Sequence, residues 1–281
     1  HKADWIQKAL RSEADGVIID LEDSVPEADK QLARENARAA ILDYTGDKAL
    51  LVRPNGLDTD HFGNDLHTVS VAGLSAYLLP MLNRRDDLVA YDSVIAAGEI
   101  ANGVPRGSIE VVASFETAAS IANADDILAG PRIGGAMAAA AKDADVSRSV
   151  GFRWTPEGSE TLYLRSRILI AARAQGLRMI VLGLWQNVRD LDGMRGFASA
   201  NAGLGYTGQV VIHPSHAPIA NEEYGLDAAT VDYYRRLVAA FEEGQRQGHG
   251  AVSFEGEHID LAHANHARER LAHLEAPMAA G

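Results

Sequence analysis

Short runs of apolar residues recur along the whole chain, separated by segments with the spacing of amphipathic helices. Each run is too short for a typical buried helix, and none alternates polar with apolar residues, so each predicts a strand covered on both faces. Helical spacing is clear in residues 28–43 and 159–175. Strands that alternate with helices in this way predict a parallel sheet. The apolar runs are residues 16–21, 49–54, 76–82, 108–115, 133–140, 178–185 and 209–213.

These runs predict one strand fewer than a (β/α)8 barrel contains. The chain opens almost directly with a helical segment, residues 3–14, so we expect a TIM-type (β/α)8 barrel whose first strand is missing from the chain. We expect the barrel to occupy residues 1–226 and a C-terminal helical extension, or lid, to occupy residues 227–281. An open, doubly wound α/β sheet is the alternative. No G-x-G-x-x-G turn follows any of the runs, which argues against a dinucleotide-binding version of that fold.

Composition and charge exclude several classes of function. The net charge is −13 and no basic stripe offsets it, so we expect no nucleic-acid partner. No stretch is long and apolar enough to span a membrane, and the first residues do not resemble a signal peptide, so we expect no membrane partner. The 281 residues contain no cysteine, which excludes disulfides and thiolate chemistry and fits a cytoplasmic location.

Charged and polar residues follow several of the expected strands. In a barrel the loops after the strands carry the chemistry, and a buried charge needs a partner. Acids and an arginine at one rim would pair with one another, or would bind a divalent cation and an anionic substrate. For Asp23 alone, capping of the helix that starts near Pro26 is an alternative explanation. The residues at these positions are Glu22, Asp23, Arg53, Asn55, Glu116, Asp143, Asp145 and His213.

Several segments resemble, in the right order, motifs of the citrate lyase β-subunit-like proteins of the HpcH/HpaI aldolase superfamily. The resemblance covers most of the chain and implies a TIM-type barrel enzyme that binds Mg²⁺ through a Glu and an Asp at successive strand ends. The matching segments are ADGVIIDLEDSVP (14–26), LVRPNGLDT (51–59), SFETA (114–118), LYLRSRILIAARAQGL (162–177), the block 189–224 and the tail segment 248–269.

The resemblance assigns the Mg²⁺ ligands to Glu116 and to one of two aspartates. Counting back from Gly151 gives Asp145, whereas counting forward from Glu116 favours Asp143. We expect Asp145, because the residues that end with Gly151 also agree with the family pattern. The same resemblance gives catalytic roles to Arg53, Asp260, Glu22 and Asp23, and substrate binding to Arg53 and Asn55.

The tail resembles a C-terminal lid whose acid reaches the active site of a neighbouring subunit, and Asp260 matches that acid. From the residues alone, a carboxylate at a helix N-terminus is the simpler explanation of Asp260. The glycine-rich residues 244–260 suit a hinge before the lid. The resemblance therefore predicts a homo-oligomer, a trimer, in which Asp260 completes a neighbour's site.

The expected reaction is aldol- or Claisen-type cleavage of a carbon–carbon bond in a β-hydroxy acid thioester such as citryl-, malyl- or citramalyl-CoA. Lys142 is the only lysine near a strand end in this interpretation, so a Schiff-base aldolase is not indicated. Two alternatives stay open. The protein could be an aldolase for free hydroxy-keto acids, or a non-catalytic binding or assembly subunit.

Overall fold

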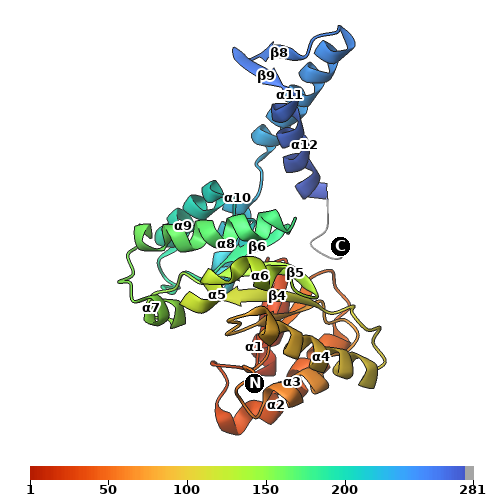
Figure 1. Ribbon diagram of the computed structural model, residues 1–281, viewed down its shortest axis with the longest axis vertical. Coiled ribbons are helices and arrows are strands. Elements are labelled where there is room, and N and C mark those ends of the chain that lie inside the picture. Colours follow the sequence, from red (N-terminus) through yellow and green to blue (C-terminus); the bar gives the residue numbers. More distant parts are fainter. Residues whose placement is uncertain (276–281) are drawn as a thin grey trace. The chain divides into compact units, whose positions relative to one another are not determined.

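A computed structural model describes residues 1–275, and these form two compact units (Figure 1). The first unit runs from His1 to Tyr224, and the second begins at Gly225. Within residues 1–275, none of the helices combines the length and the apolar character that crossing a bilayer requires.

The first unit is built on one sheet of seven strands that pair in parallel and in sequence order. Six of the predicted runs each contain a shorter strand, whereas the last run, residues 209–213, shares only Gln209 with the two-residue strand observed there. Because the strand order never reverses, the doubly wound alternative is excluded. The sheet forms a curled half-barrel, which confirms the TIM-type prediction. The strands are β1 (Gly16–Asp20), β2 (Ala49–Arg53), β3 (Ala76–Leu79), β4 (Glu110–Phe115), β5 (Ile133–Ala138), β6 (Met179–Leu182) and β7 (Gly208–Gln209).

Helices connect the successive strands, and the predicted helical segments 28–43 and 159–175 correspond to α2 and α8. The α-helices are α1 (Ala3–Leu10), α2 (Lys30–Asp43), α3 (Phe62–Val69), α4 (Arg85–Ala101), α5 (Ala118–Ala122), α6 (Ala124–Leu128), α7 (Asp145–Val150), α8 (Leu162–Ala174), α9 (Leu191–Leu204) and α10 (Ala217–Tyr224). Short 3-10 turns are η1 (Glu27–Asp29), η2 (Ser159–Thr161) and η3 (Pro214–His216).

Apolar side chains fill both faces of the sheet. On β2, Leu51 packs with Leu78 and Val112 in a small cluster, whereas Leu50 and Val52 belong to the large cluster that includes the helices. Successive residues of a strand point to opposite faces, so the small cluster lines the inside of the curl and the large one lies between sheet and helices. Burial on both faces explains why the strands read as continuous apolar runs.

Strand register brings the carboxyl ends of the strands to one edge. Asp20 is the register partner of Arg53 across β1 and β2, and Phe115 is the partner of Ala138 across β4 and β5. Polar residues that end or follow these strands therefore lie along the same edge of the half-barrel.

The second unit is mostly helical, as expected, but it also contains a β-hairpin. Its elements are α11 (Ala228–Arg246), β8 (Ala251–Phe254), β9 (Glu257–Asp260) and α12 (Leu261–Glu275). The strands β8 and β9 pair in antiparallel fashion around Glu255 and Gly256, which have φ angles of 49° and 88°. Two positive φ values are typical of the tight turn that matches the twist of paired strands. The prediction of a hinge over residues 244–260 is therefore wrong, because most of this segment is paired in the hairpin or lies in α11.

Candidate active site

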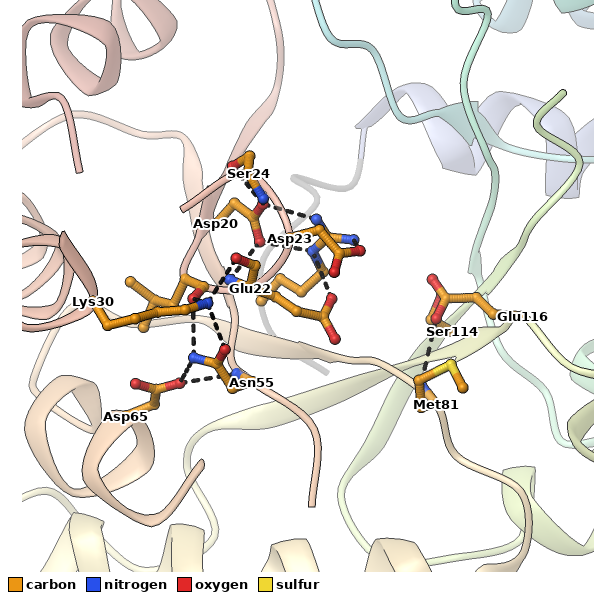
Figure 2. A network of polar contacts seen from close by, with 12 residues as sticks. Asp20, Glu22, Asp23, Ser24, Lys30, Asn55, Asp65, Met81, Ser114 and Glu116 are labelled. Atoms are coloured by element: carbon orange, nitrogen blue, oxygen red, sulfur yellow. Dashed lines mark hydrogen bonds and ion pairs between the residues drawn. The ribbon is translucent and has the colours of Figure 1, made fainter. Parts of the chain in front are cut away.

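Arg53 ends β2 directly beside Asp20, which ends β1. The Nε and Nη2 groups of Arg53 donate hydrogen bonds to the two carboxylate oxygens of Asp20, each at 2.7 Å. Asp20 also accepts hydrogen bonds from the backbone and the hydroxyl of Ser24 (Figure 2). Burial alone would raise the pKa of Asp20, but hydrogen bonds and charge from Arg53 lower it to about 2. The carboxylate thus fixes the plane of the guanidinium.

Glu22 and Asp23 also lie close to this guanidinium. The Oε2 atom of Glu22 is 3.3 Å from Arg53 Nε, and Oδ2 of Asp23 is 3.9 Å from Nη1. Burial raises the pKa of Glu22 to about 8, with repulsion from Asp23, Glu116 and Asp20 in the same direction and the charge of Arg53 opposing. The structure therefore brings both predicted acids to Arg53.

The capping explanation for Asp23 is not supported. The turn η1 is preceded by Pro26 and α2 by Asp29, and neither start receives a side-chain capping hydrogen bond. The Asp23 side chain is 71 % exposed, so it faces solvent at the rim.

Glu116 follows β4 and accepts hydrogen bonds from two neutral donors. Ser114 Oγ donates to Oε1 at 2.8 Å, and the backbone N–H of Met81 donates to Oε2 at 3.3 Å (Figure 2). Met81 has a φ of 52°, a left-handed conformation that residues with a side chain rarely adopt and that clusters at functional sites. Burial raises the pKa of Glu116, opposed by the Ser114 hydrogen bond and the charge of Arg53, while Asp145 adds to the rise.

Asp145 is the first residue of α7, and its side chain is 40 % exposed. Its carboxylate forms an ion pair with Arg148 at 2.5 Å. The charge of Asp145 adds slightly to the rise in the pKa of Glu116. Asp143 lies two residues earlier with a φ of 51°.

The acids at this rim fit Mg²⁺. Among residues 1–275, no three His, Cys, Asp or Glu side chains converge into a ready-made metal cage. Mg²⁺ does not need one, because it keeps several waters and is usually bound by one or two carboxylates. Burial is the main cause that raises the pKa values of Glu22 and Glu116, and neighbouring carboxylates add to the rise while the charge of Arg53 opposes it. A divalent cation would relieve that accumulation of negative charge.

Asn55 lies behind the rim in a buried polar network. Its Nδ2 donates to the carbonyl of Leu21 and to Asp65, and its Oδ1 accepts from Lys30 Nζ (Figure 2). Asp65 in turn pairs with Arg34 at 3.0 Å. The Asn55 side chain is only 3 % exposed, so this geometry does not support the predicted direct contact with substrate.

Two residues of this site, Asp20 and Lys30, were not predicted from the sequence. The sequence predicts Glu22 and Asp23 as the partners of Arg53, whereas the shortest ion pair is with Asp20. Asp20 lies within the apolar run 16–21 in the sequence, but only the strand register places it opposite Arg53. The sequence also indicates Lys142 as the only lysine near a strand end, whereas the ammonium of Lys30 lies 2.7 Å from the carbonyl oxygen of Leu21, directly after β1.

Asp260 ends β9 in the second unit. Its Oδ1 accepts a hydrogen bond from the backbone N–H of Ala262 at 3.0 Å and lies 2.6 Å from Nδ1 of His263. Hydrogen bonds from His263 lower the pKa of Asp260. Asp260 therefore sits at the start of α12, as the simpler explanation of this acid requires. Its role in a neighbour's site stays a prediction.

The chain is similar to known proteins along nearly its whole length. The HpcH/HpaI aldolase/citrate lyase family matches residues 1–214. A (3S)-malyl-CoA thioesterase of Cereibacter sphaeroides is 33% identical over 273 residues, which covers 96% of this chain and 90% of that protein. An L-malyl-CoA/beta-methylmalyl-CoA lyase of Rhodobacter capsulatus is 33% identical over 280 residues, with coverage of 91% and 86%. The structure of CitE from Mycobacterium tuberculosis in complex with magnesium, acetoacetate and coenzyme A superposes with a TM-score of 0.74 at 27% identity, covering 98% of this chain and 96% of that one.

Proposed function

This chain belongs to the HpcH/HpaI aldolase/citrate lyase family, and from that premise we propose that it is a Mg²⁺-dependent carbon–carbon lyase for a β-hydroxy acid CoA thioester. Malyl-, citramalyl- and citryl-CoA are the candidate substrates, and the two malyl-CoA relatives favour the first. One observation carries the proposal. The Arg53 guanidinium, fixed by Asp20, lies at a rim where Glu22 and Glu116 have raised pKa values caused chiefly by burial.

We assign the binding of Mg²⁺ to Glu116 and Asp145, with Glu22 and Asp23 accepting hydrogen bonds from the waters around the ion. A bound Mg²⁺ supplies Lewis-acid polarisation of the substrate oxygens. A cation held here would lower the pKa values of Glu22 and Glu116, because its charge favours the ionised carboxylates.

Arg53 stabilises negative charge on the reacting molecule. Asp20 engages its Nε and Nη2 groups, and Asp23 lies 3.9 Å from Nη1, beyond hydrogen-bond distance, so the N–H groups of Nη1 can donate to a substrate oxygen. During cleavage the hydroxyl of the substrate loses a proton, and the electron pair of the broken carbon–carbon bond passes into a thioester enolate. The enolate then takes up a proton to give the shorter acyl-CoA. A donor held in place before the reaction is most effective against charge that develops in this way.

The proton transfer is assigned to Asp260 of a neighbouring subunit in a homotrimer. Asp260 and Arg53 belong to different compact units of the chain. A shared site therefore requires a second unit to pack against a first unit. Asp260 is ionised near neutral pH and can accept a proton, but hydrogen bonds from His263 lower its pKa and make it a weaker base, so the proposed role requires that it leaves His263.

The test is a cleavage assay with malyl-, citramalyl- and citryl-CoA, with and without Mg²⁺. With malyl-CoA we expect glyoxylate and acetyl-CoA in equal amounts, and we expect EDTA to abolish the reaction. No cleavage of any of the three thioesters by the folded protein would contradict the proposal. Cleavage of free hydroxy-keto acids instead would favour the aldolase alternative, and inactivity on both classes would favour a binding subunit.

Thioester hydrolysis is a second candidate, favoured by the similarity to a (3S)-malyl-CoA thioesterase. Hydrolysis of malyl-CoA releases malate and free CoA, whereas the lyase reaction releases glyoxylate and leaves the thioester intact in acetyl-CoA. Measuring free thiol and glyoxylate in the same sample separates the two reactions. Both candidate reactions use CoA thioesters, which are intracellular metabolites, so we also propose a cytoplasmic location.

A further inference from the structure

Lys30 is the first residue of α2, and it is almost completely buried, with 8 % exposure. Its ammonium lies 2.7 Å from the carbonyl oxygen of Leu21, 2.8 Å from that of Glu22 and 2.7 Å from Oδ1 of Asn55 (Figure 2). These three acceptors satisfy the three N–H donors of the ammonium.

All three acceptors are neutral. In the described part of the chain no carboxylate forms an ion pair with Lys30, whereas Arg34 on the same helix pairs with the buried Asp65. Burying an ammonium without a counter-ion costs free energy, and an apolar side chain of similar length would avoid that cost. A general contribution to stability therefore does not explain a lysine at this position.

The acceptors belong to the two loops that carry the candidate site. Leu21 and Glu22 follow β1, and Asn55 lies two residues after Arg53. Leu21 also donates its backbone N–H to the carbonyl of Arg53 at 2.9 Å. The ammonium of Lys30 thus binds both loops. It contacts the backbone of Leu21 and Glu22 in the loop after β1 and the side chain of Asn55 in the loop after β2.

We propose that Lys30 is a positioning residue, whose ammonium holds the loop after β1 against the loop after β2 and so sets the place of Glu22 beside Arg53. Lys30 does not touch the substrate in this proposal and acts through the backbone that it binds. For its effect on turnover, the inference rests on the proposed lyase function. Its effect on the loops is independent of that function.

The chain offers a matched control at the other end of the same two strands. Lys48 precedes β2, and its ammonium lies 2.5 Å from the carbonyl oxygen of Ala14, which precedes β1. Lys48→Met therefore removes a lysine-to-carbonyl link between the same strands while leaving the carboxyl ends untouched.

Hydrogen exchange tests the positioning role without any activity assay. The backbone N–H groups of Leu21, Glu22, Ser24 and Val25 all donate hydrogen bonds in the structure, so their exchange reports the order of this loop. In Lys30→Met we expect the exchange of these groups to accelerate about ten-fold. An acceleration of this size corresponds to a loss of local stability equal to the contribution of about one hydrogen bond. In Lys48→Met we expect exchange at these residues to be unchanged.

Turnover and chemical rescue complete the test. Misplaced catalytic groups lower rates steeply, so we expect kcat of Lys30→Met to fall about ten- to hundred-fold and that of Lys48→Met to stay near the wild-type value. Because the chain has no cysteine, Lys30→Cys can be alkylated at this one position with 2-bromoethylamine in the unfolded state and then refolded. The product carries an ammonium at nearly the same distance from the backbone, and we expect it to regain both slow exchange and turnover.

Several results would overturn the proposal. Wild-type exchange rates in Lys30→Met, an equal acceleration in Lys48→Met, or a folded alkylated protein that regains neither property would each contradict it. If Lys30→Met does not fold, Lys30→Gln, which keeps a hydrogen-bond donor, replaces it in the same comparison. If the wild-type protein cleaves no thioester, the proposed function fails, while the exchange measurements still decide the role of Lys30.

Discussion

Asp20 and Arg53 face each other across β1 and β2 as register partners, and two hydrogen bonds of 2.7 Å join them. Both residues are the last of their strands, so the sheet rather than a loop fixes their separation. The pair holds a guanidinium between acids that would otherwise repel one another. Because Asp20 accepts from Nε and Nη2, Nη1 makes no hydrogen bond to it. That nitrogen is suited to binding an anionic substrate.

Asp20→Asn tests this pair through the pH dependence of stability. Burial would raise the pKa of Asp20, yet Arg53 lowers it from 3.8 to about 2. A lowered pKa means that the folded state favours the carboxylate. The resulting stability is present above the unfolded pKa and is lost as the pH falls through the folded pKa. Two pKa units correspond to about 2–3 kcal/mol. As the pH falls from about 5 to about 2, the free energy of unfolding of the wild type should decrease. The decrease in Asp20→Asn should be smaller by about 2 kcal/mol, because an asparagine at this position does not titrate.

Urea unfolding at a series of pH values measures this difference. Asp125→Asn is the control, because Asp125 accepts two hydrogen bonds from Arg167 in a similar geometry but is exposed. Solvent screens such a surface pair, so its removal should change the pH dependence little. Parallel pH profiles for the wild type and Asp20→Asn would show that the buried pair does not contribute in this way.

Arg53→Lys tests the need for a forked donor. A lysine keeps the positive charge but cannot bind Asp20 through two nitrogens and also reach the substrate. Loss of one donor to a developing oxyanion lowers the rate by about 10²–10³, and we expect a fall of this size in kcat. Steady-state kinetics on the cleaved thioester, with circular dichroism to confirm folding, measures it. Arg167→Lys is the matched control, because Arg167 binds the exposed Asp125 through two nitrogens outside the candidate site. Near-normal turnover of Arg53→Lys would leave Arg53 a structural partner of Asp20.

The strands could be predicted because a sheet covered on both faces imposes continuous apolar runs on the sequence. The convergence of Glu22, Asp23 and Arg53 followed from the same fact, since parallel strands end at one edge. The choice among the acids needed the register, which the sequence does not display. Register alone decides that Asp20, rather than Glu22, lies opposite Arg53.

Lys30 was missed for a different reason. It reaches the rim from the first turn of α2, so a search confined to strand ends passes over it. The hairpin of β8 and β9 was missed because its turn is Glu255-Gly256, which lacks the Asn-Gly or Asp-Gly pair that marks tight hairpins most clearly. Glycine at 248, 250 and 256 therefore suggested a flexible segment instead.

Glu116→Gln tests the metal site by binding rather than by rate. Removing the charge of a candidate ligand should weaken Mg²⁺ binding by at least about ten-fold, as measured by titration calorimetry. Because burial raises the pKa of Glu116, protons compete with the cation at a higher pH than for an ordinary glutamate. We therefore expect wild-type affinity for Mg²⁺ to fall as the pH is lowered.

Glu110→Gln provides the control for this experiment. Glu110 is the first residue of β4, at the opposite end of the strand that Glu116 follows, and burial raises its pKa as well. Its replacement changes the protein's charge equally but lies away from the candidate site. Equal losses of Mg²⁺ affinity in both variants would indicate a general effect of charge and would remove Glu116 from the ligand set.

The second ligand can be decided with three variants. If Asp145 binds Mg²⁺, Asp145→Asn should weaken binding while Asp143→Asn should not. Arg148 pairs with Asp145 at 2.5 Å and therefore competes with the cation for its carboxylate. Arg148→Ala should accordingly strengthen Mg²⁺ binding by a few-fold, about the worth of an exposed ion pair. Weaker binding in Asp143→Asn with normal binding in Asp145→Asn would transfer the assignment to Asp143.

The last prediction concerns Asp260 and the assembly of the site from two subunits. Asp260→Asn and Arg53→Ala should each be inactive as a pure protein, because each lacks one of the groups assigned to the reaction. In a trimer that contains both variants, the intact Arg53 of one subunit can lie beside the intact Asp260 of its neighbour. Exchange of subunits should therefore restore part of the activity. Differently tagged variants show whether subunits exchange, and activity is measured on the same mixture. If both parents are inactive, mixed trimers form and no activity returns, Asp260 acts in the site of its own subunit, whereas an active Asp260→Asn protein would remove Asp260 from the reaction. A Glu257→Gln variant, altered in the same hairpin three residues earlier, should stay active alone and shows that a change of charge in β9 is not itself inactivating.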